Sequence, residues 1–532
     1  MKIIIPMAGL GQRFLNKGFK DIKPLIPIDG KPMVERVFRM FPEDSDFIFI
    51  CNEQHLETTP LRNELKRIAP KALIIPIKPH KKGPVFSCFA GFESIDDEEE
   101  VFVNYIDLIN VWDFNKFLKK VRQGGYDGAM PAFRGFHPAS LGDTFYAYMR
   151  VNEKNEMMKI REKGSFTDNR MEEFASAGGY YFSKASLMKK YFKKVYDEEL
   201  STSGEYYASI PYNYMVDDGF SVLVYELEKH IVLGTPIDYY AYTFWSDFFR
   251  NRTLLRKEEK GFEIDCTTLV PLASKKGRFF FEGHPLPKPL IPLMKQPIFL
   301  TSLSCLPVNK DNLILLSLKE YIDEYNVDYL LKSQYPNAKV LQLREITEGM
   351  ASTCLLAENH FDAEKPLMIT GPNFVIEYDK KSLGQLLEDK NIDVIIFTHK
   401  NHNYERRNPY DHTYLKLDDK EEAVTFVSER VPISNEPYED HAFVGAIFFR
   451  KGKFFLEGAK QMIRKEKRID GQFLVATSVN ELIKEGKKVV PFQVSKCISL
   501  GRDVNLKEFQ YWEEYFSQLK EHPYQKQEGI TI

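Results

Sequence analysis

The fold is decided by residues 2–14, KIIIPMAGLGQRF, in which an apolar run leads directly into two glycines and a cation. A short apolar run without polar alternation is typical of a strand that is buried on both faces of a sheet. Gly9 and Gly11 follow this strand at its carboxyl end, where their backbone amides can approach a phosphate chain closely. Arg13 adds a positive charge beside them. The stretch therefore predicts an α/β domain with a phosphate-binding loop at the edge of its sheet.

The same stretch recurs at an offset of 265 positions, as residues 267–279, TTLVPLASKKGRF. Residues 23–27, KPLIP, also recur unchanged as residues 288–292. With one or two inserted positions the match continues through four further pairs: Gly83 with Gly349, Glu162 with Glu429, Gly178 with Gly445, and Trp245 with Trp512. A repeat of this length has the size of a domain and not of a solenoid unit. We therefore expect a tandem duplication.

Each copy alternates short apolar runs with amphipathic segments. The apolar runs lie at residues 3–6, 47–51, 73–77 and 101–103, and their counterparts at 269–272, 313–317, 340–343 and 367–370. Between the first two runs, residues 33–41 place apolar side chains at a helical period, after Pro32 at a position suited to the first turn of a helix. Such alternation predicts right-handed crossovers and a mostly parallel sheet with helices on both faces. The predicted fold class is α/β, with two tandem doubly wound domains.

We place the two domains at residues 1–254 and 265–532. The linker between them, at 255–264, contains the charged run RKEEK, which suits an exposed connector. Each copy ends in an amphipathic segment with several aromatic residues, at 240–248 and 506–519, and we expect each segment to pack on its own sheet.

Composition excludes several classes of protein. The 532 residues are 43% hydrophobic and 28% charged, as in an ordinary globular protein, and the formal net charge of -3 argues against a nucleic-acid partner. No apolar run reaches the roughly 18 residues of a membrane span, and the chain starts with a strand rather than a signal-peptide pattern. We expect a cytoplasmic protein, with a homo-oligomer left open. The six cysteines stand singly, and Cys88 and Cys354 are predicted to be small buried hydrophobic residues.

The glycine loop fits neither of the two common phosphate-binding motifs. A Walker loop requires Gly-Lys-Ser/Thr directly after its glycines, whereas Lys23 stands well beyond the loop and is followed by Pro24. A Rossmann fingerprint requires a third glycine that is missing here. Arg13 and Lys23 together instead supply positive charge suited to a triphosphate and a departing pyrophosphate.

Residues 1 to 250 resemble the sugar-1-phosphate nucleotidylyltransferases, or pyrophosphorylases, and their relatives that make CDP-activated compounds. The resemblance rests on an ordered set of motifs: MAGLGQRF at 7–14, KPLIP at 23–27, GKPM at 30–33, Asp107, Glu162-Lys163, AGGY at 177–180 and GTP at 234–236. It implies a nucleotide-diphospho-sugar transferase fold of the GT-A-like type. It also implies transfer of a nucleoside monophosphate from an NTP to a phosphorylated acceptor, with release of pyrophosphate.

The resemblance assigns roles to individual residues. Arg13, Lys23 and Lys163 are the expected catalytic residues, since an acceptor that is already an anion needs alignment and neutralisation of charge rather than a strong base. Asp107 is the expected ligand of Mg²⁺, a hard ion that prefers carboxylate and phosphate oxygens, although an aspartate after a strand can also cap a helix. The remaining expected contacts are Ala8, Gly9, Gly11 and Gly83 to the nucleotide, and Glu162 and Gly178 to the acceptor.

Two departures qualify the assignment. The family commonly places a second metal carboxylate two residues before its Gly-Thr pair, and Val232 stands there in this chain. The second copy keeps Arg278, Lys288, Gly349 and Glu429 but replaces other groups, with Ser274, Lys276, Asn373, Arg430 and Gln472 at the places of Gly9, Gly11, Asp107, Lys163 and Glu205. Loss of the metal carboxylate with retention of cations suggests a site that binds an anion without turning it over.

The sequence thus predicts a nucleotidyltransferase with its catalytic site in the first domain and a diverged second domain. Resemblance favours CTP as donor, a phosphorylated sugar or small metabolite as acceptor, and a role in supplying precursors for capsule or other surface polysaccharides. Three alternatives stay open: a bifunctional enzyme with an active second domain, a GT-A-type glycosyltransferase, and a non-catalytic scaffold that binds nucleotide sugars. The stretch Asn104-Tyr105-Ile106-Asp107 lacks the Asp-x-Asp of many glycosyltransferases.

Overall fold

The computed structural model describes residues 1–142, 146–255, 262–273, 286–294, 296–401 and 408–524. Its residue contacts divide the chain into two compact units. The first unit holds residues 1–257 and 511–527, and the second holds residues 258–510 and 528–532. The division falls inside the linker predicted at 255–264. Residues 511–527, which the predicted boundaries give to the second domain, group with the first unit.

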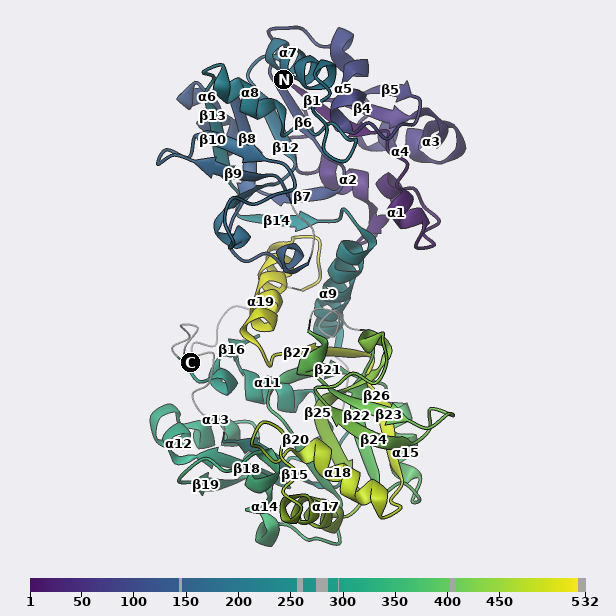
Figure 1. Ribbon diagram of the computed structural model, residues 1–532, viewed down its shortest axis with the longest axis vertical. Helices are drawn as coiled ribbons and strands as arrows, with labels where there is room; N and C mark the ends of the chain where they lie inside the picture. Colours follow the sequence, from purple (N-terminus) through teal and green to yellow (C-terminus); the bar gives the residue numbers. More distant parts are fainter. Residues whose placement is uncertain (143–145, 256–261, 274–285, 295, 402–407, 525–532) are drawn as a thin grey trace. The chain divides into compact units, whose positions relative to one another are not determined.

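The first unit is built on one large sheet, and its strand order is β5-β4-β1-β6-β12-β8, with β13 beside β8 (Figure 1). The bounds are β1 Lys2–Met7, β4 Asp46–Asn52, β5 Leu73–Ile77, β6 Val101–Asn104, β8 Gly128–Phe133, β12 Gly179–Phe182 and β13 Val222–Glu226. All neighbours pair in parallel except β12, which is antiparallel to both β6 and β8. Beyond β8, β11 (Phe174–Ser176), β9 (Tyr148–Val151) and β10 (Met157–Arg161) extend the sheet in antiparallel register.

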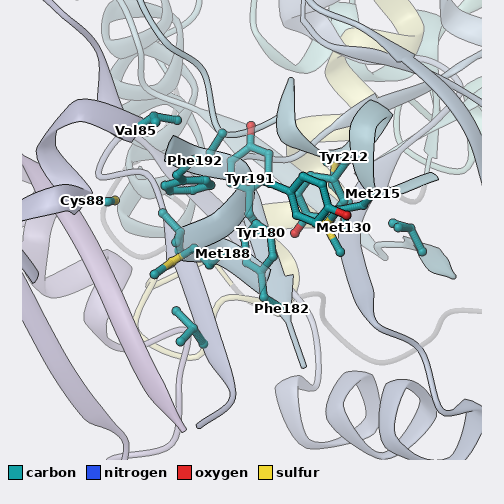
Figure 2. Packing of buried hydrophobic residues seen from close by; sticks show 14 of the residues in the cluster. Val85, Cys88, Met130, Tyr180, Phe182, Met188, Tyr191, Phe192, Tyr212 and Met215 are labelled. Carbon is teal, nitrogen blue, oxygen red and sulfur yellow. The ribbon is translucent and has the colours of Figure 1, made fainter. Parts of the chain in front are cut away.

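Helices cover both faces of this sheet, as a doubly wound fold requires. The helices are α1 Gln12–Leu15, α2 Met33–Phe38, α3 Glu53–Thr58, α4 Leu61–Ile68, α5 Pro84–Cys88, α6 Phe114–Gly124, α7 Ala185–Asp197, α8 Pro211–Asp217 and α9 Pro236–Leu255. Side chains alternate along β1, so that Ile4 packs in one hydrophobic cluster with α5, α7 and α8, while Ile3 and Ile5 pack in a second cluster with α2, α4 and α6. Figure 2 shows the first cluster, in which the ring of Phe192 of α7 lies 5.6 Å from that of Phe182 of β12, centroid to centroid.

Two small antiparallel pairs lie outside the large sheet of the first unit. β2 (Pro27–Ile28) and β3 (Lys31–Pro32) form a hairpin directly after Lys23. β7 (Leu108–Val111) pairs with β14 (Lys229–Val232), which brings the segment after Asp107 beside the segment before Gly234.

The second unit repeats the strand order of the first. Its sheet runs β19-β18-β15-β20-β25-β22-β26, and β25 is the antiparallel strand at the position that β12 takes in the first unit. The bounds are β15 Thr267–Leu272, β18 Leu313–Leu318, β19 Lys339–Leu343, β20 Leu367–Thr370, β22 Val394–His399, β25 His441–Phe449 and β26 Val489–Gln493. The predicted α/β fold of two mostly parallel sheets is thus confirmed for the described residues.

Smaller strands and the helices complete the second unit. The strand pairs are β16 Pro292–Leu293 with β17 Gln296–Pro297, β21 Phe374–Glu377 with β27 Lys496–Ser499, and β23 Thr413–Leu417 with β24 Val424–Glu429. The helices are α11 Ile298–Ser304, α12 Lys319–Tyr325, α13 Val327–Lys332, α14 Met350–Leu355, α15 Lys380–Glu388, α17 Gly452–Arg464 and α18 Val475–Lys484. All six cysteines are buried, as predicted for Cys88 and Cys354. Among the helices of the described residues, none is long and apolar enough to cross a membrane.

The end of helix α19 (Asp503–Gln518) differs from its expected place. The amphipathic segment at 506–519 was expected to pack on the sheet of its own copy, but its residues from Tyr511 onward belong to the first unit. The Tyr511 hydroxyl donates a hydrogen bond to the His230 carbonyl, and the Trp512 ring lies 5.9 Å from the Tyr242 ring of α9, centroid to centroid. An aromatic face of this kind buries equally well against any complementary apolar surface, so its periodicity does not specify the partner.

We expect Gly178→Ala to destabilise the first unit. Gly178 has φ +71°, and a Cβ built there would lie 1.9 Å from Cδ1 of Leu108. The left-handed backbone costs an L-residue about 1–2 kcal/mol, and overpacking adds about 1–3 kcal/mol. Gly125→Ala is the matched control, because φ is +64° there and no atom lies within 4 Å of the added Cβ. Calorimetric melting should show a clearly larger fall in Tm for the first variant, and equal shifts would contradict the clash.

Candidate active site

The glycine loop extends from the carboxyl end of β1, at the edge of the sheet where β6 also ends. Ala8 is buried, whereas Gly9 is exposed, with no atom within 4 Å of the place where its Cβ would stand. Gly11 has φ +65° and precedes α1, and a Cβ there would lie 3.5 Å from Cβ of Lys23. The loop therefore lies alongside Lys23 and leaves open space above Gly9.

The Lys23 ammonium group joins three segments that are distant in sequence. Its Nζ donates to Oδ2 of Asp107 at 2.5 Å, just beyond β6, and to the carbonyl of Gly234 at 3.2 Å, between β14 and α9. It also lies 5.6 Å from the centroid of the Phe14 ring, in α1. The Lys23 and Asp107 side chains are 18% and 24% exposed, so both can still be reached by a ligand. The structure thus brings these two predicted residues into direct contact.

A second carboxylate lies near this pair. Asp238, in the first turn of α9, accepts hydrogen bonds from the backbone amide of Thr235 at 2.9 Å and from its hydroxyl at 2.7 Å. A Cβ on Gly234 would lie 3.4 Å from Oδ2 of Asp107 and 3.9 Å from Oδ2 of Asp238, so the two carboxylates flank the same glycine. Burial raises the pKa of Asp238, and the neighbouring charge of Asp107 raises it further.

Asp238 was not predicted from the sequence, because the family pattern places the second carboxylate two residues before Gly234, where this chain has Val232. A signal was nevertheless present. A threonine followed three residues later by an acidic residue is a capping pattern, in which the acidic side chain turns back toward the start of the helix. Here that start lies beside Lys23 and Asp107.

The carboxylates of Asp107 and Asp238 suit a divalent cation that takes most of its ligands from substrate. In the described part of the chain no cluster of three or more His, Cys, Asp or Glu side chains is arranged to hold a metal ion. Mg²⁺ commonly keeps several waters and binds through one or two carboxylates together with substrate phosphates. Asp107 fits that pattern, because it is a partly exposed carboxylate at the carboxyl edge of the sheet, in contact with Lys23.

Glu162 and Lys163 follow β10 and lie beside a tyrosine. Lys163 has φ +53°, and its Nζ lies 4.8 Å from the centroid of the Tyr207 ring. The Tyr207 hydroxyl donates to Glu205, and the charge of Arg13 acts on Tyr207 against the burial that raises its pKa. Of the two predicted cations, Lys163 is the one whose contact with this ring is direct.

Glu162 is mostly buried and accepts a hydrogen bond from the Ser209 hydroxyl. Burial is the main cause that raises the pKa of Glu162, and Glu205 adds to it, while Ser209 and Lys163 oppose the rise. A carboxylate in such a place is a strong hydrogen-bond acceptor, and it suits a hydroxyl-bearing acceptor better than a second anion.

Gly83 and Gly178 both have structural reasons to be glycine. At Gly83, φ is +86° and an added Cβ would lie 2.7 Å from the backbone nitrogen of Tyr206. Hydrogen bonds from Tyr206 to Lys82 and from Val85 to Tyr206 hold the two segments together on either side of this glycine. The carbonyl of Gly178 accepts from the amide of Tyr105. The predicted contacts of both glycines with substrate stay predictions.

Around Asn373 and Lys288, the second unit repeats two hydrogen bonds of the first, with an amide side chain in place of the carboxylate. The amide of Leu500 donates to the carbonyl of Asn373 at 2.7 Å, as the amide of Leu233 donates to that of Asp107 at 2.8 Å. Lys288 donates to the carbonyl of Gly501 at 2.8 Å, matching the bond from Lys23 to Gly234, and burial lowers its pKa to about 8.

The other predicted residues of the second unit are placed only in part. Arg430, with φ +57° like Lys163, forms an ion pair with Asp470. Glu429 accepts from the Thr413 hydroxyl, as Glu162 accepts from Ser209. Ser274, Lys276 and Arg278 lie outside the described residues.

Comparison with known proteins agrees with this geometry. Residues 3–166 match the family model of the MobA-like NTP transferase domain. This stretch includes the glycine loop, Lys23, Asp107, Glu162 and Lys163, and it supports a nucleotidyltransferase activity in the first unit. The resemblance to nucleotidylyltransferases noted in the sequence is thereby confirmed at the level of the domain.

Many solved structures also match. The nucleoside-diphosphate-sugar pyrophosphorylase from Vibrio cholerae is 19% identical over 45% of this chain and 98% of its own, with a TM-score of 0.38. The inositol-1-phosphate CTP transferase from T. maritima is 12% identical over 48% of this chain and 97% of its own, with a TM-score of 0.37. A UDP-glucose pyrophosphorylase from Acinetobacter baumanii is 16% identical over 48% and 99%, with a TM-score of 0.37. A search of curated protein sequences gave no match.

We expect Asp107→Asn to lower Mg²⁺-dependent turnover of NTP by about 10²- to 10³-fold, the effect usual for one electrostatic group at a reacting phosphate. The fold should persist, because Asn373 already occupies the corresponding place in the second unit. Pyrophosphate release measures turnover, and circular dichroism checks folding.

Asp46→Asn is the matched control for this variant. It also breaks an aspartate–lysine pair, with Lys2, but that pair lies at the opposite, amino end of β1 and β4. It should leave turnover unchanged. Wild-type activity in Asp107→Asn would exclude Asp107 as the metal ligand.

Proposed function

We propose that the first unit transfers a nucleoside monophosphate, CMP by preference, from an NTP to a phosphorylated sugar or small metabolite. The observation that carries the proposal is the contact of Lys23 with Asp107 beside the open glycine loop, at the carboxyl edge of a parallel sheet. Ligands of open α/β sheets bind at this edge. The family match to an NTP transferase domain supports the same donor class.

The reaction joins an oxygen of the acceptor's phosphate to the α-phosphorus of the NTP. The bond from that phosphorus to the bridging oxygen of the β-phosphate breaks, and the electron pair leaves with pyrophosphate. The acceptor oxygen is already anionic, so no proton has to be removed. The enzyme's task is therefore to align two anions and to stabilise the charge that gathers on the leaving group.

Each predicted residue has a part in that task. The amides of the glycine loop and Arg13 would bind the triphosphate, and Lys23 would exchange its contact with Asp107 for the pyrophosphate oxygens. Lys163 would neutralise the acceptor phosphate, and Glu162 would accept hydrogen bonds from the acceptor's hydroxyl groups. Asp107 would hold Mg²⁺, which supplies further positive charge to the phosphates when it is bound.

The second unit is proposed to bind anions without transferring a nucleotide. Asn373 carries no charge for a divalent ion, whereas Lys288 keeps its place against Gly501. The matching strand orders of the two sheets support a duplication followed by loss of activity in one copy. A role in precursor supply for capsule or other surface polysaccharide, and a cytoplasmic location where NTPs are available, complete the proposal.

We expect pyrophosphate release from one NTP, CTP first, in a panel of four NTPs with phosphorylated acceptors. A glycosyltransferase would act on a nucleotide sugar without consuming NTP, and a scaffold would release no pyrophosphate. Absence of release with every pair would overturn the proposal.

Paired double variants test which unit is active. Lys23→Ala with Asp107→Asn should remove all NTP turnover, because the charges that bind pyrophosphate and metal are lost together. Lys288→Ala with Asn373→Ala makes matching changes in the second unit and should spare most turnover. Substantial residual activity in the first double variant, with a changed preference for NTP or acceptor, would instead show a bifunctional enzyme.

A further inference from the structure

A cluster of charges surrounds the hairpin that follows Lys23. Its turn residue, Asp29, has φ +47° and a side chain that is 8% exposed. The Asp29 carboxylate accepts hydrogen bonds from the hydroxyls of Tyr242 and Ser246 and an ion pair at 3.0 Å from Arg250, all on α9. These bonds thus connect the β2–β3 hairpin, which follows Lys23, to helix α9, which follows Gly234.

Arg36 of α2 holds the same turn from its other side. Its Nε donates to the carbonyl of Ile28 at 3.1 Å, and one terminal nitrogen donates to the carbonyl of Asp29 at 3.3 Å. The Arg36 side chain is only 8% exposed, so its charge needs a close partner. Glu521 is the nearer of two carboxylate partners. Its Oε2 lies 2.7 Å from Nη1 of Arg36 and its Oε1 accepts from Lys31 at 2.6 Å, while Oδ2 of Asp29 lies 3.9 Å from Nη2 of Arg36.

The stretch that carries Glu521 is bound to the first unit along its length. We name residues 511–524 the returning segment. His522 contacts both the hydroxyl and the carbonyl of Ser246 at 3.2 Å, next to the bond from Ser246 to Asp29. The ring of Phe516 lies 5.4 Å from that of Tyr242. The returning segment therefore reaches the hairpin through both Arg36 and Ser246.

The second unit shows that the hairpin itself does not require these charges. At the offset of 265, Asp29, Lys31 and Arg36 correspond to Met294, Gln296 and Thr301. Met294 keeps the left-handed backbone with φ +46°, and the Thr301 hydroxyl donates to the carbonyl of Leu293 much as Arg36 donates to that of Ile28. The left-handed turn residue thus recurs without charges at these three positions, whereas Lys295, between Met294 and Gln296, lies outside the described residues. In the first unit Lys31 and Arg36 pair with Glu521 of the returning segment, whereas Asp29 binds α9.

We propose that Glu521 is a positioning residue that holds the Lys23 segment in place for the nucleotide, through Arg36 and the hairpin turn. This inference rests on the proposed function of Lys23 in binding triphosphate. Few bonds separate Arg36 from the Lys23 segment. Arg36 binds the backbone at Ile28 and Asp29, and the amide of Met33 closes the hairpin on the carbonyl of Ile26, three residues from Lys23.

A double-mutant cycle on nucleotide affinity tests the coupling. Titration calorimetry with CTP is carried out on the full chain as wild type, Glu521→Gln, Lys23→Ala and the combination. Loss of the carboxylate charge should weaken binding about tenfold in the wild-type background, in the range of one charge-assisted hydrogen bond. It should have less than about a twofold effect once Lys23 is absent, because coupled residues are non-additive. Glu521→Asp should restore part of the affinity.

Glu226→Gln is the control, since it removes an exposed ion pair with Arg134 in the same unit and should leave affinity unchanged. Equal loss of affinity with and without Lys23 would show a merely structural role and overturn the inference. Unchanged affinity in Glu521→Gln would overturn it as well.

A second measurement separates this inference from the proposed function. Amide hydrogen exchange in Glu521→Gln should accelerate in residues 22–33 and stay at wild-type rates in β4 and β6, whether or not any nucleotide is bound. If no NTP binds or turns over, the proposed function fails while exchange still decides the positioning. Unchanged exchange in residues 22–33 would refute it.

Discussion

The ammonium group of Lys23 is the point on which the candidate site depends. One carboxylate, one carbonyl and one aromatic ring meet it, from the ends of three separate segments. A lysine that is partly removed from water loses solvation free energy, and this loss must be offset by polar or charged partners. Asp107 compensates Lys23 in the absence of nucleotide, and phosphate oxygens can do so in its presence. The Lys23 ammonium group therefore has a carboxylate partner when no phosphate is bound.

Comparison of the two units separates what the fold requires from what the chemistry requires. The backbone bond from Leu233 to Asp107 has its equivalent from Leu500 to Asn373, so the main-chain path is kept when the carboxylate becomes an amide. The lysine and its carbonyl acceptor are also kept. At this position the side-chain charge differs between the two units, while the main-chain bond is the same.

Local patterns predicted much of this molecule. The apolar runs predicted the strands, because a strand that is buried on both faces has a continuous run of hydrophobic residues. The glycines after the first strand, together with Arg13 and Lys23, predicted the phosphate-binding loop. Two features escaped. Asp238 was not predicted because its position depends on the conformation of the helix cap beside Gly234. The position of residues from Tyr511 onward was not predicted because an amphipathic pattern does not specify the surface on which the helix packs. Both depend on contacts between residues far apart in sequence, which periodicity and spacing do not encode.

The returning segment shows how such a contact can be specific nonetheless. Apolar burial of Trp512 and Phe516 supplies attraction without direction, whereas Glu521 and His522 meet groups that exist only around the hairpin of the first unit. At the positions of Asp29, Lys31 and Arg36 the second unit has Met294, Gln296 and Thr301, so the two cations that pair with Glu521 have no charged counterparts there. In the first unit Glu521 pairs with both Lys31 and Arg36, and Asp29 lies 3.9 Å from Arg36 as a second carboxylate. The charged contacts of the returning segment thus lie at the turn that follows Lys23, and they add direction to its apolar burial.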